Sequence, residues 1–485
     1  MSSLLNNDIR LLVEDQIKRY LGSTFNHLIA LPLSGSNRFY FRVILNKGTL
    51  IATYNEDILE NEAFFYLQKF FYNLSLPVPQ IVHIFDNKKL YLQEDLGDTT
   101  LYQLLTEDRK KNNTISPEIS QRYKQVIDDL IQFQLSAEKG LDFSHCYPVE
   151  AFDSQAIQWD LNYFKYMFLK LVHAPFNEKK LEEEFQKLIQ DASTAQNCYF
   201  MFRDFQSRNI MIKDNKLYYI DFQGGRRGPI FYDIASLLFD AKAELPFSFR
   251  NKLIQYYISQ ISNRIPINKE QALQQYYIFV FIRILQALGA YGYRGLFEQK
   301  EHFIKSFAPA FKNLKYLFKV SHIKSEFPYI ASLIEQQFEN PNLISLQKPS
   351  SDKLTVTITS FAYKNGYPID SSGNGGGFAF DCRALPNPGK IEHLKHFTGK
   401  DSPVKEYMEQ FDEVKKFISA CQQLVEESIK KYIERNFEHL MVNFGCTGGQ
   451  HRSVYCAEKL AKKIREKFDI NIKVIHTNQQ NWELK

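Results

Sequence analysis

Residues 200–240 constrain the chain most, because polar groups interrupt a strongly apolar context there. The stretch reads FMFRDFQSRNIMIKDNKLYYIDFQGGRRGPIFYDIASLLFD. Its salient polar side chains are Asp204, Asn209 and Asp221. A hairpin between buried strands would explain Asp214 and Asn215 as turn residues. It would not explain the other polar groups, because charge beside apolar segments needs partners or a ligand.

The order of these side chains suits metal-assisted phosphoryl transfer. In that chemistry a carboxylate accepts the proton of an attacking hydroxyl, while a carboxamide and a second carboxylate hold Mg²⁺ against nucleotide phosphates. The kinase signature His-Arg-Asp-x4-Asn, followed by Asp-Phe-Gly, has this layout. We therefore predict Asp204 as the catalytic base, and Asn209 and Asp221 as metal ligands, with ATP and Mg²⁺ as cofactors. Asp233 is predicted to tie the backbone of the catalytic loop.

The run RDFQSRN…DFQ…GP…YD resembles the aminoglycoside phosphotransferase superfamily, and most of all its bacterial N-acetylmuramate/N-acetylglucosamine anomeric kinases. The resemblance covers roughly the first two-thirds of the chain. It implies an α+β protein-kinase-like bilobal fold, with a small antiparallel sheet lobe at 1–96 and a helical lobe at 97–320. It also implies an amino-sugar acceptor, phosphorylated at its anomeric hydroxyl.

The same resemblance suggests a nucleotide site in the first lobe. A tip of small residues can lay backbone N–H groups on phosphates, although most such tips are plain hairpin turns; here it comprises Ser34, Gly35, Ser36 and Asn37. Glu94 and Leu96 fall at the hinge that meets adenine, or simply where a strand ends in a turn. The strand lysine of kinases is missing. Either Arg38 or Arg42 approaches the phosphates, or metal alone positions them.

Residues 321–351 have the composition of a helical linker, and a second, small α/β domain is expected at 352–485. In it, a strand leads through GCTGGQHRS into a helix, which is typical of a phosphate cradle. A plain glycine-rich turn is one alternative. The spacing Cys446-x5-Arg452-Ser453 leaves another, the nucleophile loop of cysteine phosphatases.

The run DCRALPNPG…LKHFTGKDSPV…NFGCTGGQHRSV resembles the C-terminal domain of the RNase adapter protein RapZ, a module that binds glucosamine 6-phosphate, a partner protein and RNA. The family's histidine after Pro-Asn-Pro is Gly389 here. The ligand contacts that the resemblance implies are Asp381, Thr447, Gly448, His451 and Arg452.

Composition narrows the functional classes. The 485 residues suggest two or three domains. The net charge of +5 comes from 60 basic and 55 acidic residues without a polybasic block, so charge gives no support for an RNA or RNase partner. Six cysteines without a C-x-x-C pair suggest a reduced compartment. With no signal peptide or long apolar run, we expect a cytoplasmic protein that does not contact membranes.

Three functions remain open on sequence alone. The first is an ATP-dependent amino-sugar kinase fused to a domain that binds a phosphorylated amino sugar. The second is a regulatory adapter with a degenerate kinase scaffold, favoured by Phe202, the absent lysine and Gln223 in place of glycine. The third is a kinase joined to a cysteine phosphatase.

Overall fold

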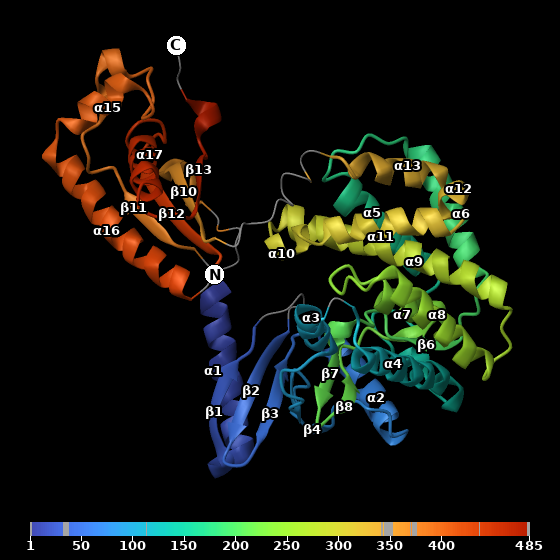
Figure 1. Ribbon diagram of the computed structural model, residues 1–485. Helices are drawn as coiled ribbons and strands as arrows, with labels where there is room; N and C mark the ends of the chain where they lie inside the picture. Colours follow the sequence, from blue (N-terminus) through green and yellow to red (C-terminus); the bar gives the residue numbers. More distant parts are fainter. Residues whose placement is uncertain are drawn as a thin grey trace. The chain divides into compact units, whose positions relative to one another are not determined.

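The computed structural model (Figure 1) describes residues 2–32, 38–112, 114–340, 343, 353–368, 370, 376–435 and 437–482. The chain divides into two compact units. The first comprises residues 1–293 and 306–343, and the second comprises residues 294–305, which include the short helix α10 (Glu301–Ile304), and residues 344–485.

The first unit begins with an antiparallel sheet of order β1-β2-β3-β5-β4. Its strands are β1 (Phe25–Ala30), β2 (Phe39–Leu45), β3 (Thr49–Tyr54), β4 (Ile81–Ile84) and β5 (Leu90–Glu94). Helix α1 (Ser2–Leu21) buries Val13 and Ile17 against the sheet, where they meet Leu28 and Val43 (Figure 1). Helix α2 (Ile58–Asn73) starts at Asp57, whose side chain accepts the Glu60 N–H and so caps the first turn. The predicted antiparallel sheet lobe is confirmed.

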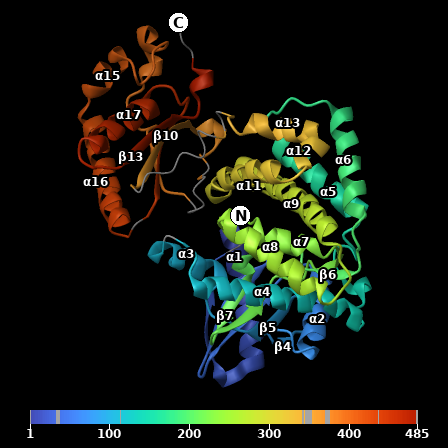
Figure 2. The same ribbon diagram turned by 45° about the vertical axis from the view of Figure 1, so that its right-hand side comes forward.

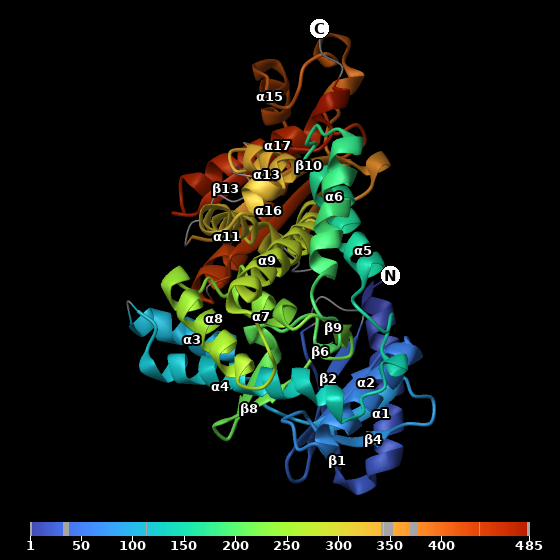
Figure 3. The same ribbon diagram turned by 90° about the vertical axis from the view of Figure 1, so that its right-hand side faces the viewer.

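The rest of the first unit is mainly helical (Figure 3). The helices are α3 (Leu101–Lys111), α4 (Pro117–Leu135), α5 (Ser154–Phe164), α6 (Glu178–Ser193), α7 (Phe231–Leu238), α8 (Phe247–Ser262), α9 (Lys269–Tyr291), α11 (Phe307–Val320), α12 (Ile323–Glu326) and α13 (Pro328–Gln337). Two small antiparallel sheets lie among them: β6 (Tyr199–Met201) pairs with β9 (Arg226–Gly228), and the hairpin of β7 (Ile210–Lys213) and β8 (Lys216–Tyr219) lies between these two strands in the sequence. These strands frame the loops that carry the predicted catalytic residues.

Helix α13 lies within the segment that the sequence marks as a linker, yet it belongs to the first unit (Figure 2). Glu184 of α6 accepts the N–H groups of Tyr329 and Ile330, each at 2.8 Å, and so caps the start of α13. The hydroxyl of Tyr329 in turn accepts the Asn177 N–H at 2.6 Å. Long-range hydrogen bonds therefore dock this helix. Residues 341–342 and 344–352 lie outside the described chain.

The second unit is a small α/β fold with a parallel sheet of order β11-β12-β10-β13. Its strands are β10 (Thr355–Ala362), β11 (Phe378–Asp381), β12 (His439–Cys446) and β13 (Asn471–His476), and its helices are α15 (Ser402–Glu409), α16 (Asp412–Glu434) and α17 (Arg452–Arg465). Strand and helix residues share one apolar core that includes Val356, Val442, Val425 and Leu460. Since the strands are parallel, their carboxyl ends meet at one edge, where such folds bind ligands.

The fold class predicted from sequence is thus confirmed in both parts, the bilobal kinase-like unit and the small α/β unit. None of the helices in the described part of the chain combines the length and the apolar character of a membrane span.

Candidate active site and second ligand site

Helix α7 holds the backbone of the catalytic loop through the side chain of Asp233. Asp233 accepts the N–H groups of Phe202 at 2.7 Å and Arg203 at 3.1 Å, which confirms its predicted role. Burial raises the pKa of Asp233 to about 7. Arg203 has a positive φ of 81° and forms a two-pronged ion pair with Asp160 of α5. These contacts fix the loop before it reaches the catalytic position.

The structure brings the three predicted catalytic and metal-binding residues together. The side-chain nitrogen of Asn209 donates to the backbone oxygen of Asp204 at 2.9 Å and to Oδ2 of Asp221 at 3.1 Å. Gln223 donates to Oδ1 of Asp221 at 2.7 Å. Asp221 is exposed and also has a positive φ, of 65°. Asn209 therefore links the backbone of Asp204 to the carboxylate of Asp221, which brings the three residues into one hydrogen-bonded group.

These residues fit a magnesium ion. Mg²⁺ prefers oxygen ligands and is commonly held by one or two protein carboxylates together with water and substrate phosphates. Asp221 offers an exposed carboxylate, and Asn209 stands beside it with an amide oxygen. Among the described residues, no group of three His, Cys, Asp or Glu side chains forms a closed metal site. Phosphate oxygens and water would therefore have to complete the coordination.

Arg283 of α9 sets the charge state of Asp204. Its Nη2 atom lies 2.8 Å from Oδ1 of Asp204, whose side chain is 48% exposed. The surrounding protein opposes ionisation of this carboxyl group, but the guanidinium groups of Arg283, then Arg203, outweigh that effect and hold the pKa of Asp204 below its usual value. Asp204 is therefore ionised at neutral pH and able to accept a proton.

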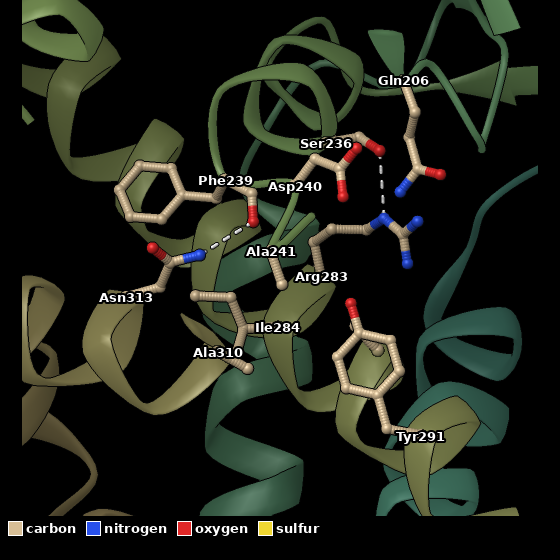
Figure 4. A pocket seen from close by; sticks show the side chains of 11 residues that line it. Gln206, Ser236, Phe239, Asp240, Ala241, Arg283, Ile284, Tyr291, Ala310 and Asn313 are labelled. Atoms are coloured by element: carbon tan, nitrogen blue, oxygen red, sulfur yellow. Dashed lines mark hydrogen bonds between the residues drawn. The ribbon is translucent and has the colours of Figure 1, made fainter. Parts of the chain in front are cut away.

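Arg283 also lines a small cavity (Figure 4). Its Nε atom donates there to the hydroxyl of Ser236 at 3.1 Å. The cavity volume of about 10 Å³ suits about one water molecule. Within the described chain, Oε1 of Gln206 and Oδ2 of Asp240 are buried without a hydrogen-bond partner. Both residues line the cavity, so an ordered water would supply the hydrogen bonds that these oxygens need.

Arg283→Gln should move the acid limb of the kcat/KM profile to higher pH. The sign follows from linkage: removing the cation raises the pKa of Asp204, so protonation inactivates the base at a higher pH. Arg283→Lys keeps the positive charge, so its acid limb should stay close to the wild-type position. The pH dependence of the phosphorylation rate measures both effects, and an unmoved limb in Arg283→Gln would show that another group controls it.

The two arginines that could replace the missing strand lysine have different partners in the structure. Arg38, just before β2 and only 2% exposed, lies with Nη2 3.1 Å from Oε2 of Glu60 on α2. Arg42 instead pairs with Asp95 at 2.6 Å and with Asp98 at 2.8 Å. Arg38 thus pairs with a glutamate of a helix, as the lysine of kinases does. The predicted loop residues Ser34, Gly35, Ser36 and Asn37 lie outside the described residues.

The predicted hinge residues connect the sheet lobe to the catalytic hairpin. Lys213, at the end of β7, donates to Oε1 of Glu94 at 2.8 Å and to the backbone oxygen of Asp95 at 2.9 Å. Leu96 is buried. Sequence reasoning missed Lys213, because the motif gives no sign that this turn residue reaches a strand more than a hundred positions earlier.

In the second unit, the predicted ligand residues gather at the carboxyl edge of the sheet. Asp381 ends β11, while Thr447, Gly448 and His451 follow β12. Arg452 is 6% exposed, and its Nη1 atom donates to two backbone oxygens, of Arg383 at 2.7 Å and of Leu385 at 3.1 Å. The guanidinium fork expected for an anion therefore already bonds, in part, to the loop after β11.

Arg383 is a further residue at this edge that the sequence did not single out. Its Nη2 atom donates to Oδ2 of Asp381 at 2.6 Å, and its guanidinium lies 3.9 Å from the ring centroid of Tyr363. Gly389 faces His451, since a Cβ atom there would lie 3.3 Å from Cε1 of the imidazole. A side chain at position 389 would therefore crowd His451, so the glycine that replaces the family's histidine lets this imidazole lie close to the backbone.

Cys446 lies beneath the loop that follows β12. Its Sγ atom accepts the Gly449 N–H at 3.2 Å and shares a hydrogen bond with Ser453 at 3.1 Å. The thiol is buried. Nη1 of Arg452 bonds to the carbonyls of residues 383 and 385, while Nη2 lies 3.4 Å from the Thr447 hydroxyl of the loop. Because the Cys446 sulfur is buried and already hydrogen-bonded, the geometry favours a structural cysteine over an exposed nucleophile.

The first unit has a two-lobed architecture with the predicted catalytic residues on its central loops. Residues 28–266 match the phosphotransferase enzyme family, and residues 354–480 match the RapZ C-terminal domain. The chain therefore joins a phosphotransferase-family domain to a RapZ C-terminal domain, and the resemblances drawn from the sequence are confirmed at this level.

Curated relatives match only part of this chain. A nucleotide-binding protein of Clostridium acetobutylicum is 42% identical over 113 residues, which are 23% of this chain and 37% of that protein. One from Acinetobacter baylyi is 35% identical over 132 residues, or 27% of this chain and 44% of that protein. The matches therefore span less than half the length of these relatives.

Solved structures overlap with the larger part of the chain. The choline kinase LicA from Streptococcus pneumoniae is 14% identical, with a TM-score of 0.43, over 62% of this chain and 98% of that one. The spectinomycin phosphotransferase APH(9)-Ia, solved with ADP and spectinomycin, is 12% identical, with a TM-score of 0.40, over 67% of this chain and 98% of that one.

Proposed function

We propose that the first unit transfers the γ-phosphoryl group of ATP to an amino sugar, at the anomeric hydroxyl of N-acetylmuramate or N-acetylglucosamine. The observation that carries this proposal is the convergence of Asp204, Asn209 and Asp221 in a phosphotransferase-family domain. The choice of an amino sugar rests on the resemblance of the run around Asp204 to the anomeric kinases.

In this mechanism Asp204 orients the acceptor hydroxyl and takes its proton, and Arg283 keeps the carboxylate ionised until the acceptor arrives. Asn209 and Asp221 would hold Mg²⁺, which when bound neutralises charge on the phosphate oxygens. The Arg38–Glu60 pair supplies a cation on the sheet-lobe side. Asp233 keeps the loop rigid, so that the base stays in position.

An acceptor panel with γ-labelled ATP tests the proposal. It should contain N-acetylmuramate and N-acetylglucosamine, together with choline and spectinomycin, which appear in the names of structurally similar proteins. Label in an amino-sugar 1-phosphate is the expected result. Label only in choline or spectinomycin would keep the phosphotransferase and reject the amino sugar, while label in no acceptor would reject the kinase.

We propose that the second unit binds a phosphorylated amino sugar such as glucosamine 6-phosphate and thereby adjusts the kinase. The support is the RapZ C-terminal match, together with the polar groups gathered after β11 and β12. A second candidate is an adapter that acts through an RNA or protein partner. The same match favours it, and it requires no phosphoryl transfer by the first unit, so the acceptor panel separates the two.

Glucosamine 6-phosphate should raise the unfolding temperature of the full chain and change its kinase rate. Ligand at a hundred times its Kd stabilises a folded state by about 2.7 kcal/mol, which corresponds to a shift of several degrees. Glucose 6-phosphate, which lacks the amine, is the matched control. If neither the unfolding temperature nor the rate responds, the two domains are not coupled through this ligand.

A further inference from the structure

Arg226 is a buried cation close to the catalytic base that no carboxylate neutralises. It lies on β9 opposite Met201, is 7% exposed, and uses Nε to donate to the Gly224 oxygen at 3.0 Å. In the part of the chain that the structure describes, no hydrogen bond or ion pair reaches its two terminal nitrogens, and neither is among the fully buried polar atoms that lack a partner, so both are accessible. Its neighbours differ, because Arg203 holds Asp160 and Arg283 holds Asp204.

Strand pairing places Arg226 beside the strand that leads into the catalytic loop, opposite Met201, which is three positions ahead of Asp204. It helps to lower the pKa of Asp204, and it interacts with Arg203, Asp160 and Cys146. Burial and the nearby Arg203 lower the pKa of Arg226 itself to about 10, so it remains charged at neutral pH.

A cation on a largely buried side chain is poorly solvated, and an anion that contacts its accessible tip would supply the missing counter-charge. The planar guanidinium fork suits two-pronged contacts to carboxylate or phosphate oxygens. A neutral reactant would leave Arg226 without a counter-charge throughout the reaction. The missing partner is therefore an anion that enters and leaves with the reactants.

We infer that Arg226 binds an oxyanion of the reactants, either a carboxylate on the acceptor sugar or the phosphoryl group in transit. This assignment rests on the proposed function and adds a specificity residue to it. It also predicts that the free protein binds a simple oxyanion at this position.

The first test needs no kinase activity. Inorganic phosphate, compared with chloride at equal ionic strength, should raise the unfolding temperature of the full chain by several degrees more than that of Arg226→Gln. Arg227→Gln, at the exposed next position on β9, is the matched control and should behave as wild type. The wild type and both variants contain the same second unit, so any stabilisation by phosphate bound there should be equal in all three proteins. Equal stabilisation of all three, or a large loss of stability in ligand-free Arg226→Gln, would overturn the assignment in favour of a structural role.

The second test identifies the source of the anion. N-acetylmuramate differs from N-acetylglucosamine by a lactyl carboxylate. If that group binds Arg226, Arg226→Gln should lower kcat/KM roughly 100-fold for N-acetylmuramate only. If the phosphoryl group binds there, kcat should fall for both sugars. Unchanged kinetics with both would overturn the inference. Should the wild type phosphorylate neither sugar, the proposed function fails, and the phosphate test still decides on Arg226.

Discussion

Asp204→Asn should lower kcat for the acceptor sugar by roughly 10² to 10⁴-fold, the range expected for loss of a general base. The affinity for Mg²⁺-ATP should remain, because the carboxylate of Asp204 contacts Arg283 and not the predicted metal ligands. The local geometry should also remain, since Asn209 bonds to the backbone oxygen of Asp204 and not to its side chain. Steady-state kinetics and nucleotide binding measure the two parts separately.

Asp214→Asn is the matched control, because Asp214 lies exposed in the turn between β7 and β8. It should leave kcat and nucleotide affinity unchanged. If Asp204→Asn retained a kcat within a few-fold of wild type, another group would have to accept the proton.

Asp221→Asn should abolish the part of ATP affinity that depends on magnesium and should also reduce turnover. Asp221 offers the one charged oxygen group in the predicted metal site, and metal-bound charge stabilisation contributes several kcal/mol, roughly 10³-fold in kcat. ATP titrations with and without Mg²⁺ should differ in the wild type and coincide in the variant. Asp86→Asn, on the exposed turn between β4 and β5, serves as control. A variant that still gains affinity from Mg²⁺ would place the metal elsewhere.

The sequence predicted the parts of the site that depend on short spacings. Asp204, Asn209 and Asp221 lie on neighbouring loops, so the motif alone brought them together, and Asp233 follows closely in the same run. The helical lobe expected at 97–320 is likewise present, with α4 burying one apolar face and α9 buried on nearly every side in its second half.

What the sequence did not reveal depends on contacts between distant segments. Arg283 comes from a helix 79 positions beyond Asp204, and Lys213 reaches Glu94 from 119 positions away. Arg38 and Arg42 differ in the carboxylate that each side chain meets, Glu60 on α2 for Arg38 and Asp95 after β5 for Arg42. Arg452 meets carbonyl groups of a loop that the phosphate-cradle motif does not contain. No local pattern encodes such partners.

A crystal structure with Mg²⁺ and a non-hydrolysable ATP analogue tests the central claim most directly. We expect a metal ion held by Asp221 and Asn209. The terminal phosphate should face Asp204 across a gap that admits a sugar hydroxyl. Asp204, Asn209 and Asp221 pointing apart, or a nucleotide site filled by the protein's own side chains, would contradict it.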